Sequence, residues 1–241
     1  MITLYQFPIS HFCEKVRWAL DFKGLEYRTR NLLPGEHSKV VKALAEKSEL
    51  PVLQHNKEVI QGSSQIITYL DQAFPDKLLT PIDPAKKQQA LDWEDYADQN
   101  IGPHTRLYFY HHLLDATQLI MPLLVHGQPW HKQWMFRAIF PEVRKKMRVL
   151  MRINEKSACT SLEHIKAAID RLAAQYVNKP FLTGGQFTRA DIAAAALLAP
   201  FRSPSKYGLA WPKVFPAELQ QSVELFKDQL AWVDSLYLDF R

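Results

Sequence analysis

The chain has 241 residues, 47% of them hydrophobic and 23% charged, so it can bury a sizeable core in one large or two modest domains. Its net charge of +5 is spread over a mixture of acids and bases, which indicates solubility rather than a nucleic-acid surface. Two cysteines are too few for a disulfide framework, and no segment reaches the ~20 apolar residues that cross a bilayer, so we expect a cytoplasmic protein outside the membrane.

The first 75 residues alternate strand and helix signals in the order βαβ-ββα. A right-handed crossover makes the first two strands parallel, and the short HNKE turn between the last two makes an antiparallel hairpin. The sequence therefore predicts a small mixed sheet flanked by helices. Strands are expected at 2–7, 25–32, 51–55 and 58–61, and helices at 11–23, 37–47 and 63–73.

The segment PISHFCEKVRWALDFKG at 8–24 predicts a helix that begins at the N-cap Ser10 and ends near Gly24. Unpaired backbone N–H groups and the helix dipole favour anions at this point, and the same field stabilises a thiolate at Cys13. A structural interpretation is equally open. Ser is a preferred N-cap for structural reasons alone, and an isolated Cys is commonly a small buried hydrophobe.

After residue 75 the strand signals nearly vanish and helical patterns continue to the end of the chain. The stretch FPDKLLTPIDP contains three prolines and reads as a linker. Thr188 lies three residues before Asp191, which predicts a capping box at the start of a buried helix. Helices are expected at 85–117, 117–126, 131–156, 160–177, 189–200 and 216–236, with breaks or kinks at Pro103, Pro122 and Pro141.

Two features of the sequence raise the questions of nucleic-acid binding and of metal binding. The residues around them support neither function. The basic run RKKMRV at 144–149 lies within a helical pattern without a recognition module nearby, so we interpret it as a solvated helix face and expect no nucleic-acid partner. Nine histidines are present, but His111 and His112 are adjacent and diverge on a helix, and no HExxH or CxxC pattern occurs. No metal site is expected.

The order of these parts resembles the cytosolic glutathione transferase family. The resemblance covers the whole chain and is carried by SHFCEKVRWAL, ELPVL at 49–53, IQGSSQIITYLD at 60–71 and TGGQFTRADIAAA at 183–195. It implies an α/β plus all-α fold. A thioredoxin-like glutathione-binding domain at 1–76 would be followed by an all-helical domain at 85–241 that lines the electrophile site.

The resemblance also implies a glutathione site. Pro51 stands where the family carries a cis-proline, which would turn the backbone of Leu50 outward to pair with the cysteinyl part of glutathione. Ser63 matches the helix N-terminal Ser that holds the γ-glutamyl carboxylate. Gly62 departs from the acidic residue usual before that Ser, which weakens the expected grip on the γ-glutamyl ammonium. From the residues alone, Pro51 could equally be an ordinary strand-starting proline.

Ser10 falls at the family position of the activating Ser or catalytic Cys, and Cys13 follows three residues later. If Ser10 acts, its hydroxyl donates a hydrogen bond to the glutathione sulfur and favours the thiolate. If Cys13 acts, it forms a mixed disulfide with glutathione. We expect Ser10 to act, because a Cys inside the first turn of the helix is more easily buried.

The electrophile site is expected between the domains, on the first long helix of the second one. Tyr96, Asn100, His104 and Tyr108 recur at four-residue spacing and could face this cleft together with Trp93. The alternative is that these side chains only pack the helix against its neighbours.

The resemblance implies a homodimeric glutathione transferase, active in detoxification, that conjugates or reduces hydrophobic electrophiles with glutathione as co-substrate. The alternative is a binding or regulatory protein that keeps the fold without turnover, with Gly62 as its main support.

Overall fold

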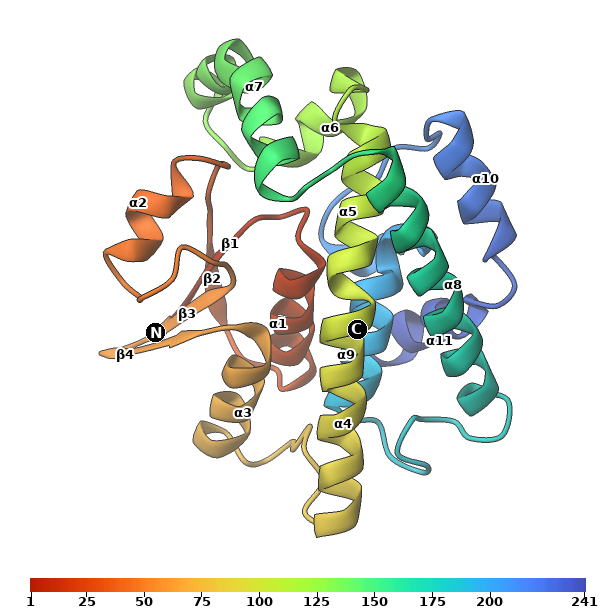
Figure 1. Cartoon of the computed structure of the whole chain (residues 1–241). Coiled ribbons are helices and arrows are strands. Elements are labelled where there is room, and N and C mark those ends of the chain that lie inside the picture. The colour runs from red at the N-terminus through yellow and green to blue at the C-terminus, as the bar shows by residue number, and fades with distance from the viewer.

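The computed structural model describes all residues, 1–241, and begins with a four-stranded mixed sheet of strand order β2-β1-β3-β4. β1 (Ile2–Gln6) pairs in parallel with β2 (Tyr27–Asn31) across the connecting helix α1 (His11–Phe22). β3 (Val52–His55) is antiparallel to both β1 and β4 (Glu58–Gln61). The sheet, with α2 (His37–Lys42) and α3 (Ser63–Ala73), confirms the predicted βαβ-ββα order (Figure 1).

The rest of the chain is helical, which confirms the predicted fold class. None of these helices combines the length and the apolar character that crossing a membrane requires. The helices are α4 (Pro84–Asn100), α5 (Gly102–Leu113), α6 (Thr117–Leu124), α7 (Trp130–Leu150), α8 (Glu155–Tyr176), α9 (Arg189–Arg202), α10 (Ala217–Leu225) and α11 (Ala231–Phe240), with a short 3-10 turn η1 (Ser205–Tyr207).

The expected helix 85–117 is two helices, because the chain breaks at Ile101 between α4 and α5. Pro103 lacks the N–H that would continue the α4 hydrogen-bond ladder, as the sequence predicted. The expected helix 216–236 is likewise divided, into α10 and α11. By contrast, Pro141 lies inside the continuous helix α7.

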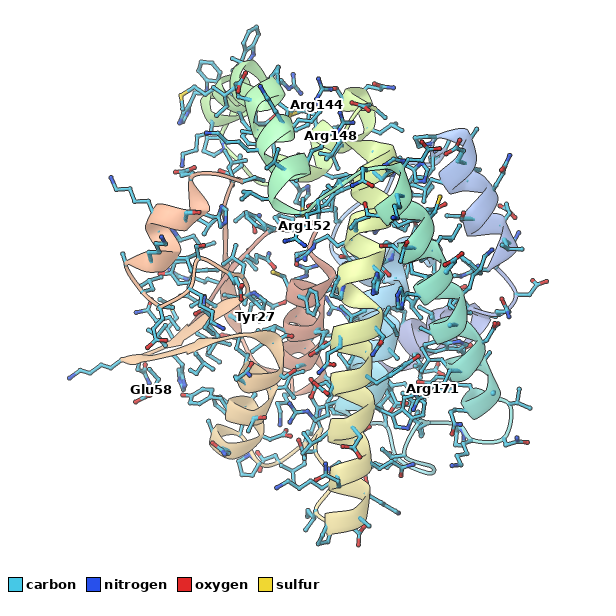
Figure 2. All side chains as sticks on the ribbon, viewed as in Figure 1. Tyr27, Glu58, Arg144, Arg148, Arg152 and Arg171 are labelled. Carbon is cyan, nitrogen blue, oxygen red and sulfur yellow. The ribbon has the colours of Figure 1, made fainter.

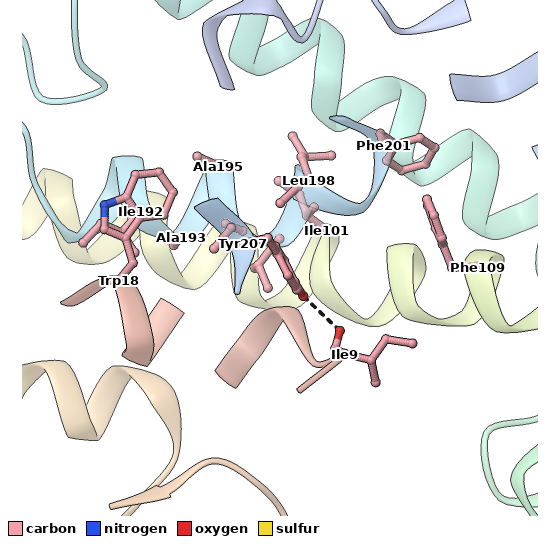
Figure 3. Packing of buried hydrophobic residues seen from close by; sticks show 14 of the residues in the cluster. Ile9, Trp18, Ile101, Phe109, Ile192, Ala193, Ala195, Leu198, Phe201 and Tyr207 are labelled. Atoms are coloured by element: carbon pink, nitrogen blue, oxygen red, sulfur yellow. Dashed lines mark hydrogen bonds between the residues drawn. The ribbon is translucent and has the colours of Figure 1, made fainter. Parts of the chain in front are cut away.

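Helix α9 is the centre of the core, since every residue from Arg189 to Phe201 is buried. The predicted capping box starts it: the backbone N–H of Thr188 donates to the Asp191 carboxylate at 2.9 Å, and the Thr188 side chain accepts from the Asp191 backbone. The helix packs against α1 and α4. Figure 3 shows its apolar side chains beside Trp18 of α1 and Ile101 after α4.

A buried ion network ties α1, α3, α4 and α9 together. Glu94 on α4 pairs with Lys15 Nζ at 3.1 Å and with Arg189 Nε at 2.5 Å. Arg189 also donates to the carbonyl of Ser64 at 2.7 Å and to the hydroxyl of Thr68 at 2.9 Å, both on α3. Because the three charges are almost fully buried, each depends on its partners for compensation.

The proline-rich connection to α4 is held in place rather than loose. The Asp71 carboxylate accepts hydrogen bonds from the backbone N–H of Leu79 at 3.0 Å and of Thr80 at 2.8 Å. Lys23 pairs with the same carboxylate at 2.8 Å and donates to the Lys77 carbonyl at 2.6 Å. The connection therefore fixes where α4 begins relative to the sheet.

Replacing Arg189 by Met should lower the free energy of unfolding by about 3 to 5 kcal/mol, since Glu94 would keep its burial and lose one of its two cations. Urea denaturation measures this. The control is Lys227→Met, which removes an ion pair whose side chains are 59% and 58% exposed and should change stability by less than about 1 kcal/mol. Equal effects of the two substitutions would contradict the assigned importance of the buried network.

Candidate functional site

Three segments of the chain meet at one end of the sheet because of the strand register. Tyr5 lies opposite Val52, and Val52 lies opposite Gln61. The end of β1, the start of β3 and the end of β4 are therefore neighbours. The loop that follows β1, the Leu50–Pro51 peptide and the start of α3 consequently come together there.

Two of these segments are joined by a backbone hydrogen bond from the N–H of Gly62 to the carbonyl of Pro51 at 3.1 Å. The Leu50–Pro51 peptide is cis, as the resemblance implied. Gly62 has φ 95, and a Cβ there would lie 2.3 Å from the Gln65 side-chain oxygen. A larger residue, including the acidic one expected from the resemblance, would strain this backbone. Ser63 follows as the first, buried residue of α3.

The loop that carries Ser10 is held from two sides. Tyr207 donates its hydroxyl hydrogen to the carbonyl of Ile9 at 2.9 Å (Figure 3), and Arg17 donates to the carbonyl of Pro8 at 3.2 Å. Ser10 is the N-cap of α1, where its side-chain oxygen accepts from the N–H of Cys13 at 3.4 Å. Its own hydroxyl hydrogen takes part in no hydrogen bond within the chain, so it can be donated to a ligand.

Cys13 lies only one turn into α1, yet it is fully buried. Burial raises the pKa of the Cys13 thiol, and this effect outweighs the opposing influence of the Ser10 hydroxyl and the Arg17 charge. The field of the helix N-terminus therefore does not produce a reactive thiolate at Cys13. Of the two residues, only Ser10 lines the neighbouring cavity.

This cavity of about 270 Å³ lies between the sheet end and the helical part, and most of its wall is apolar. One wall comes from the loops after β1, β2 and α2, and includes Ser10 and Leu50. The other comes from one face of α5, the end of α7 and the region after α9. The lining residues are Phe7, Ile9, Ser10, His11, Phe12, Pro34, His37, Ser48, Glu49, Leu50, Thr105, Arg106, Phe109, Tyr110, Leu113, Met147, Leu150, Met151, Pro200 and Trp211.

A close contact between α1 and α5 sets the distance between these walls. A Cβ on Gly102 would lie 2.3 Å from Cζ of the Phe12 ring, so a larger residue there would require the ring to move. Gly102 is also the first residue of α5, directly after the break from α4. The break and the contact together turn one face of α5 toward the cavity.

Two titratable side chains that line the cavity, His11 and Tyr110, each keep one protonation state near neutral pH. Burial, with a smaller contribution from the Arg106 charge, lowers the pKa of His11 to about 3, so its ring is neutral. Burial raises the pKa of Tyr110 to about 12, so its hydroxyl keeps its proton. Arg106 is exposed at the cavity and forms no ion pair or hydrogen bond within the chain.

The three aromatic residues predicted for the electrophile site lie outside this cavity. The guanidinium carbon of Arg171 on α8 lies 4.1 Å from the centroid of the Tyr96 ring. Figure 2 labels Arg171 on this side of the molecule. His104 is stacked on His164 at 4.2 Å, and Tyr108 shares a 2.6 Å hydrogen bond with Ser222 of α10. These side chains pack α4 and α5 against α8 and α10, which was the alternative interpretation.

Sequence reasoning missed the neighbouring positions on α5 because it continued one four-residue row, from 96 to 108, across the expected break at Pro103. The cavity-facing residues follow the four-residue spacing as well, in two rows: 105, 109 and 113, and 106 and 110. Periodicity alone does not decide which row faces a cavity. The proximity of Gly102 to Phe12, which does decide it, is a tertiary contact.

The basic run on α7 is partly neutralised within the chain. Arg144 pairs with Asp115 at 3.4 Å, and Arg148 pairs with the same carboxylate. Figure 2 labels both arginines on α7. This arrangement agrees with a solvated helix face. No group of three or more His, Cys, Asp or Glu side chains is positioned to hold a metal ion.

Comparisons with known proteins assign both parts of the chain to one family. Residues 4–78 match the family model for the glutathione S-transferase N-terminal domain, and residues 141–217 match the one for the C-terminal domain. A probable glutathione S-transferase, parA of Nicotiana tabacum, is 32% identical over 102 residues, which are 42% of this chain and 46% of that protein. The chain thus spans about half the length of the curated relatives it matches.

Solved structures resemble the whole chain at low sequence identity. The beta-etherase LigF from Sphingobium sp. strain SYK-6 has a TM-score of 0.66 and 19% identity, and the match covers 98% of both chains. A theta class glutathione S-transferase from Xanthomonas axonopodis pv. citri, solved with glutathione bound, has a TM-score of 0.62 and 18% identity over 96% of this chain and 94% of that one. These likenesses concern the fold.

The two cysteines should differ sharply in reactivity. Cys159 is exposed, whereas Cys13 is buried with a raised thiol pKa, so a disulfide reagent at pH 8 should modify one thiol rapidly in the native protein and both after denaturation. Thiol release followed by absorbance measures this. In the control variant Cys159→Ser the rapid phase should disappear. Two rapid phases in the native protein would contradict the burial of Cys13.

Proposed function

Because the chain belongs to the glutathione S-transferase family, we propose that it conjugates hydrophobic electrophiles with glutathione or reduces them with it. The observation that carries this proposal is the position of Ser10. Its hydroxyl lies at the N-terminus of α1, lines the cavity and has a hydrogen free to donate. These are the requirements for stabilising the glutathione thiolate at the bottom of the cavity.

The proposed glutathione site is the sheet end, in the part of the chain at 1–76. Leu50 lines the cavity beside the cis-peptide and supplies backbone groups for the cysteinyl part of the tripeptide. Ser63 and the N–H groups at the start of α3 would hold the γ-glutamyl carboxylate, with Gly62 keeping the backbone in its left-handed conformation. The electrophile would lie against helices of the part at 85–241.

In the proposed reaction, Ser10 donates a hydrogen bond to the glutathione sulfur and lowers the pKa of its thiol, and the thiol proton passes to solvent. The sulfur forms a bond to an electrophilic carbon, and the leaving group departs with its electron pair. The apolar wall of α5 and α7 excludes water from the nucleophile. Cys13 takes no part, because its thiol is buried and protonated.

Replacing Ser10 by Ala should remove the hydrogen bond to the thiolate and leave glutathione affinity nearly unchanged. A charge-assisted hydrogen bond contributes roughly 1.5 to 3 kcal/mol, so the conjugation rate should fall roughly tenfold to a hundredfold. The pKa of bound glutathione, from the ultraviolet absorbance of its thiolate, should rise. Conjugation of a chloronitrobenzene and retention on immobilised glutathione are the two further measurements.

The matched control is Cys13→Ala, which should leave conjugation nearly unchanged apart from a small packing penalty. If Cys13→Ala abolishes activity on a disulfide substrate while Ser10→Ala keeps it, the protein is a thiol-disulfide enzyme. If the parent binds glutathione without turnover, it is the binding or regulatory protein that Gly62 suggests.

We further propose a cytoplasmic homodimer. The two unbridged cysteines support a reducing compartment. Membership of the glutathione S-transferase family supports pairing of two chains across the first part and the start of the second. Light scattering at micromolar concentration should give twice the mass of the 27.9 kDa chain, and a monomeric mass would refute the dimer.

A further inference from the structure

Half of the chain's buried polar side-chain atoms without a hydrogen-bond partner belong to residues that line the cavity. Six buried side-chain nitrogen or oxygen atoms in the chain lack a hydrogen bond, and three of them belong to lining residues: His11 Nε2, Thr105 Oγ1 and Trp211 Nε1. Leaving such a polar group without a hydrogen bond is unfavourable, so three of them around one cavity call for an explanation. A purely hydrophobic substrate would offer these atoms no hydrogen-bonding group.

The cavity is also lined by a cation without an ion pair, the Arg106 guanidinium on α5. Arg106 and Tyr110 are four residues apart on α5 and point to one face, and neither side chain has a hydrogen-bond partner within the chain. The only acidic lining residue, Glu49, lies on the loop before Leu50, on the opposite wall. The wall formed by α5 therefore offers a guanidinium and a phenol hydroxyl, both of which donate hydrogen bonds.

We propose that the second substrate is an aromatic electrophile carrying a carboxylate, with the carboxylate bound by Arg106 and Tyr110 and the ring held in the apolar part of the wall. Phe109, Leu113 and Met147 supply that apolar surface. A planar guanidinium binds a carboxylate through two parallel hydrogen bonds, which a Lys or a neutral donor does not reproduce. The inference rests on the proposed glutathione transfer and narrows its substrate class from hydrophobic to anionic aromatic.

The test compares two electrophiles that differ in one charge: a chlorodinitrobenzoate and its methyl ester. In both reactions the glutathione sulfur bonds to the ring carbon, the carbon–chlorine bond breaks, chloride leaves with the electron pair and the thiol proton passes to solvent. The variant is Arg106→Gln. The matched control is Arg137→Gln, which removes an exposed, unpaired arginine of α7 that does not line the cavity.

For the benzoate, Arg106→Gln should lower kcat/KM about tenfold to a hundredfold, mainly through KM. For the ester it should change kcat/KM less than about threefold, and Arg137→Gln should leave both reactions within that range. An equal loss for the two electrophiles would overturn the proposal. So would a rise in the KM for glutathione with both, since Arg106 would then bind the tripeptide.

A binding measurement separates this inference from the proposed transfer activity. Titration calorimetry with the unreactive dinitrobenzoate, which lacks the chlorine, should show about tenfold weaker binding to Arg106→Gln than to the parent. If this holds while neither electrophile is consumed, the carboxylate site stands and the transfer activity fails. If conjugation occurs but the parent binds dinitrobenzoate no better than the variant does, the transfer activity stands and the carboxylate site is wrong.

Discussion

The buried ion pair between Glu94 and Arg189 is the contact on which the rest of the structure depends. Arg189 is the first residue of α9, and its guanidinium reaches α3 and α4 at once. The pair fixes α9 against the sheet-bearing part of the chain, and α9 is the apolar surface on which α1 packs. Ser10 caps α1, so the packing of α1 on α9 contributes to the position of its hydroxyl, together with the hydrogen bonds from Tyr207 and Arg17 to the loop.

Ser10 and Cys13 show how position within a single helical turn separates two chemistries. Both lie at the same helix N-terminus and experience the same dipole. Ser10 is at the cavity surface, where its hydroxyl can reach a ligand, whereas Cys13 is packed into the core. Desolvation of a thiolate outweighs the dipole at the buried position. The field of a helix is useful only to a group that keeps access to the ligand.

Much of this architecture could be predicted from the sequence, because it depends on local rules. The hairpin strand at 58–61, the helix at 63–73 and the Thr188 capping box are all where the pattern put them. A break near Pro103 was predicted, but the cavity wall on α5 could not be, since the face of α5 that turns to the cavity depends on the tertiary contact of Gly102 with Phe12. The same holds for Trp211, which lies outside any regular element and has no periodicity that could place it.

The two walls of the cavity differ in what holds them, and this has an evolutionary consequence. The wall at the sheet end is positioned by strand register, a cis-peptide and a backbone hydrogen bond, with the Tyr207 and Arg17 side chains holding the Ser10 loop. The opposite wall, from α5, α7 and the region around Trp211, takes its surface from the lining side chains of these helices and this loop. Descendants of this chain can therefore acquire new substrates by point mutation on one wall while inheriting the other unchanged. Gly102 is the exception, because a Cβ there would lie 2.3 Å from the Phe12 ring, and the ring would have to move.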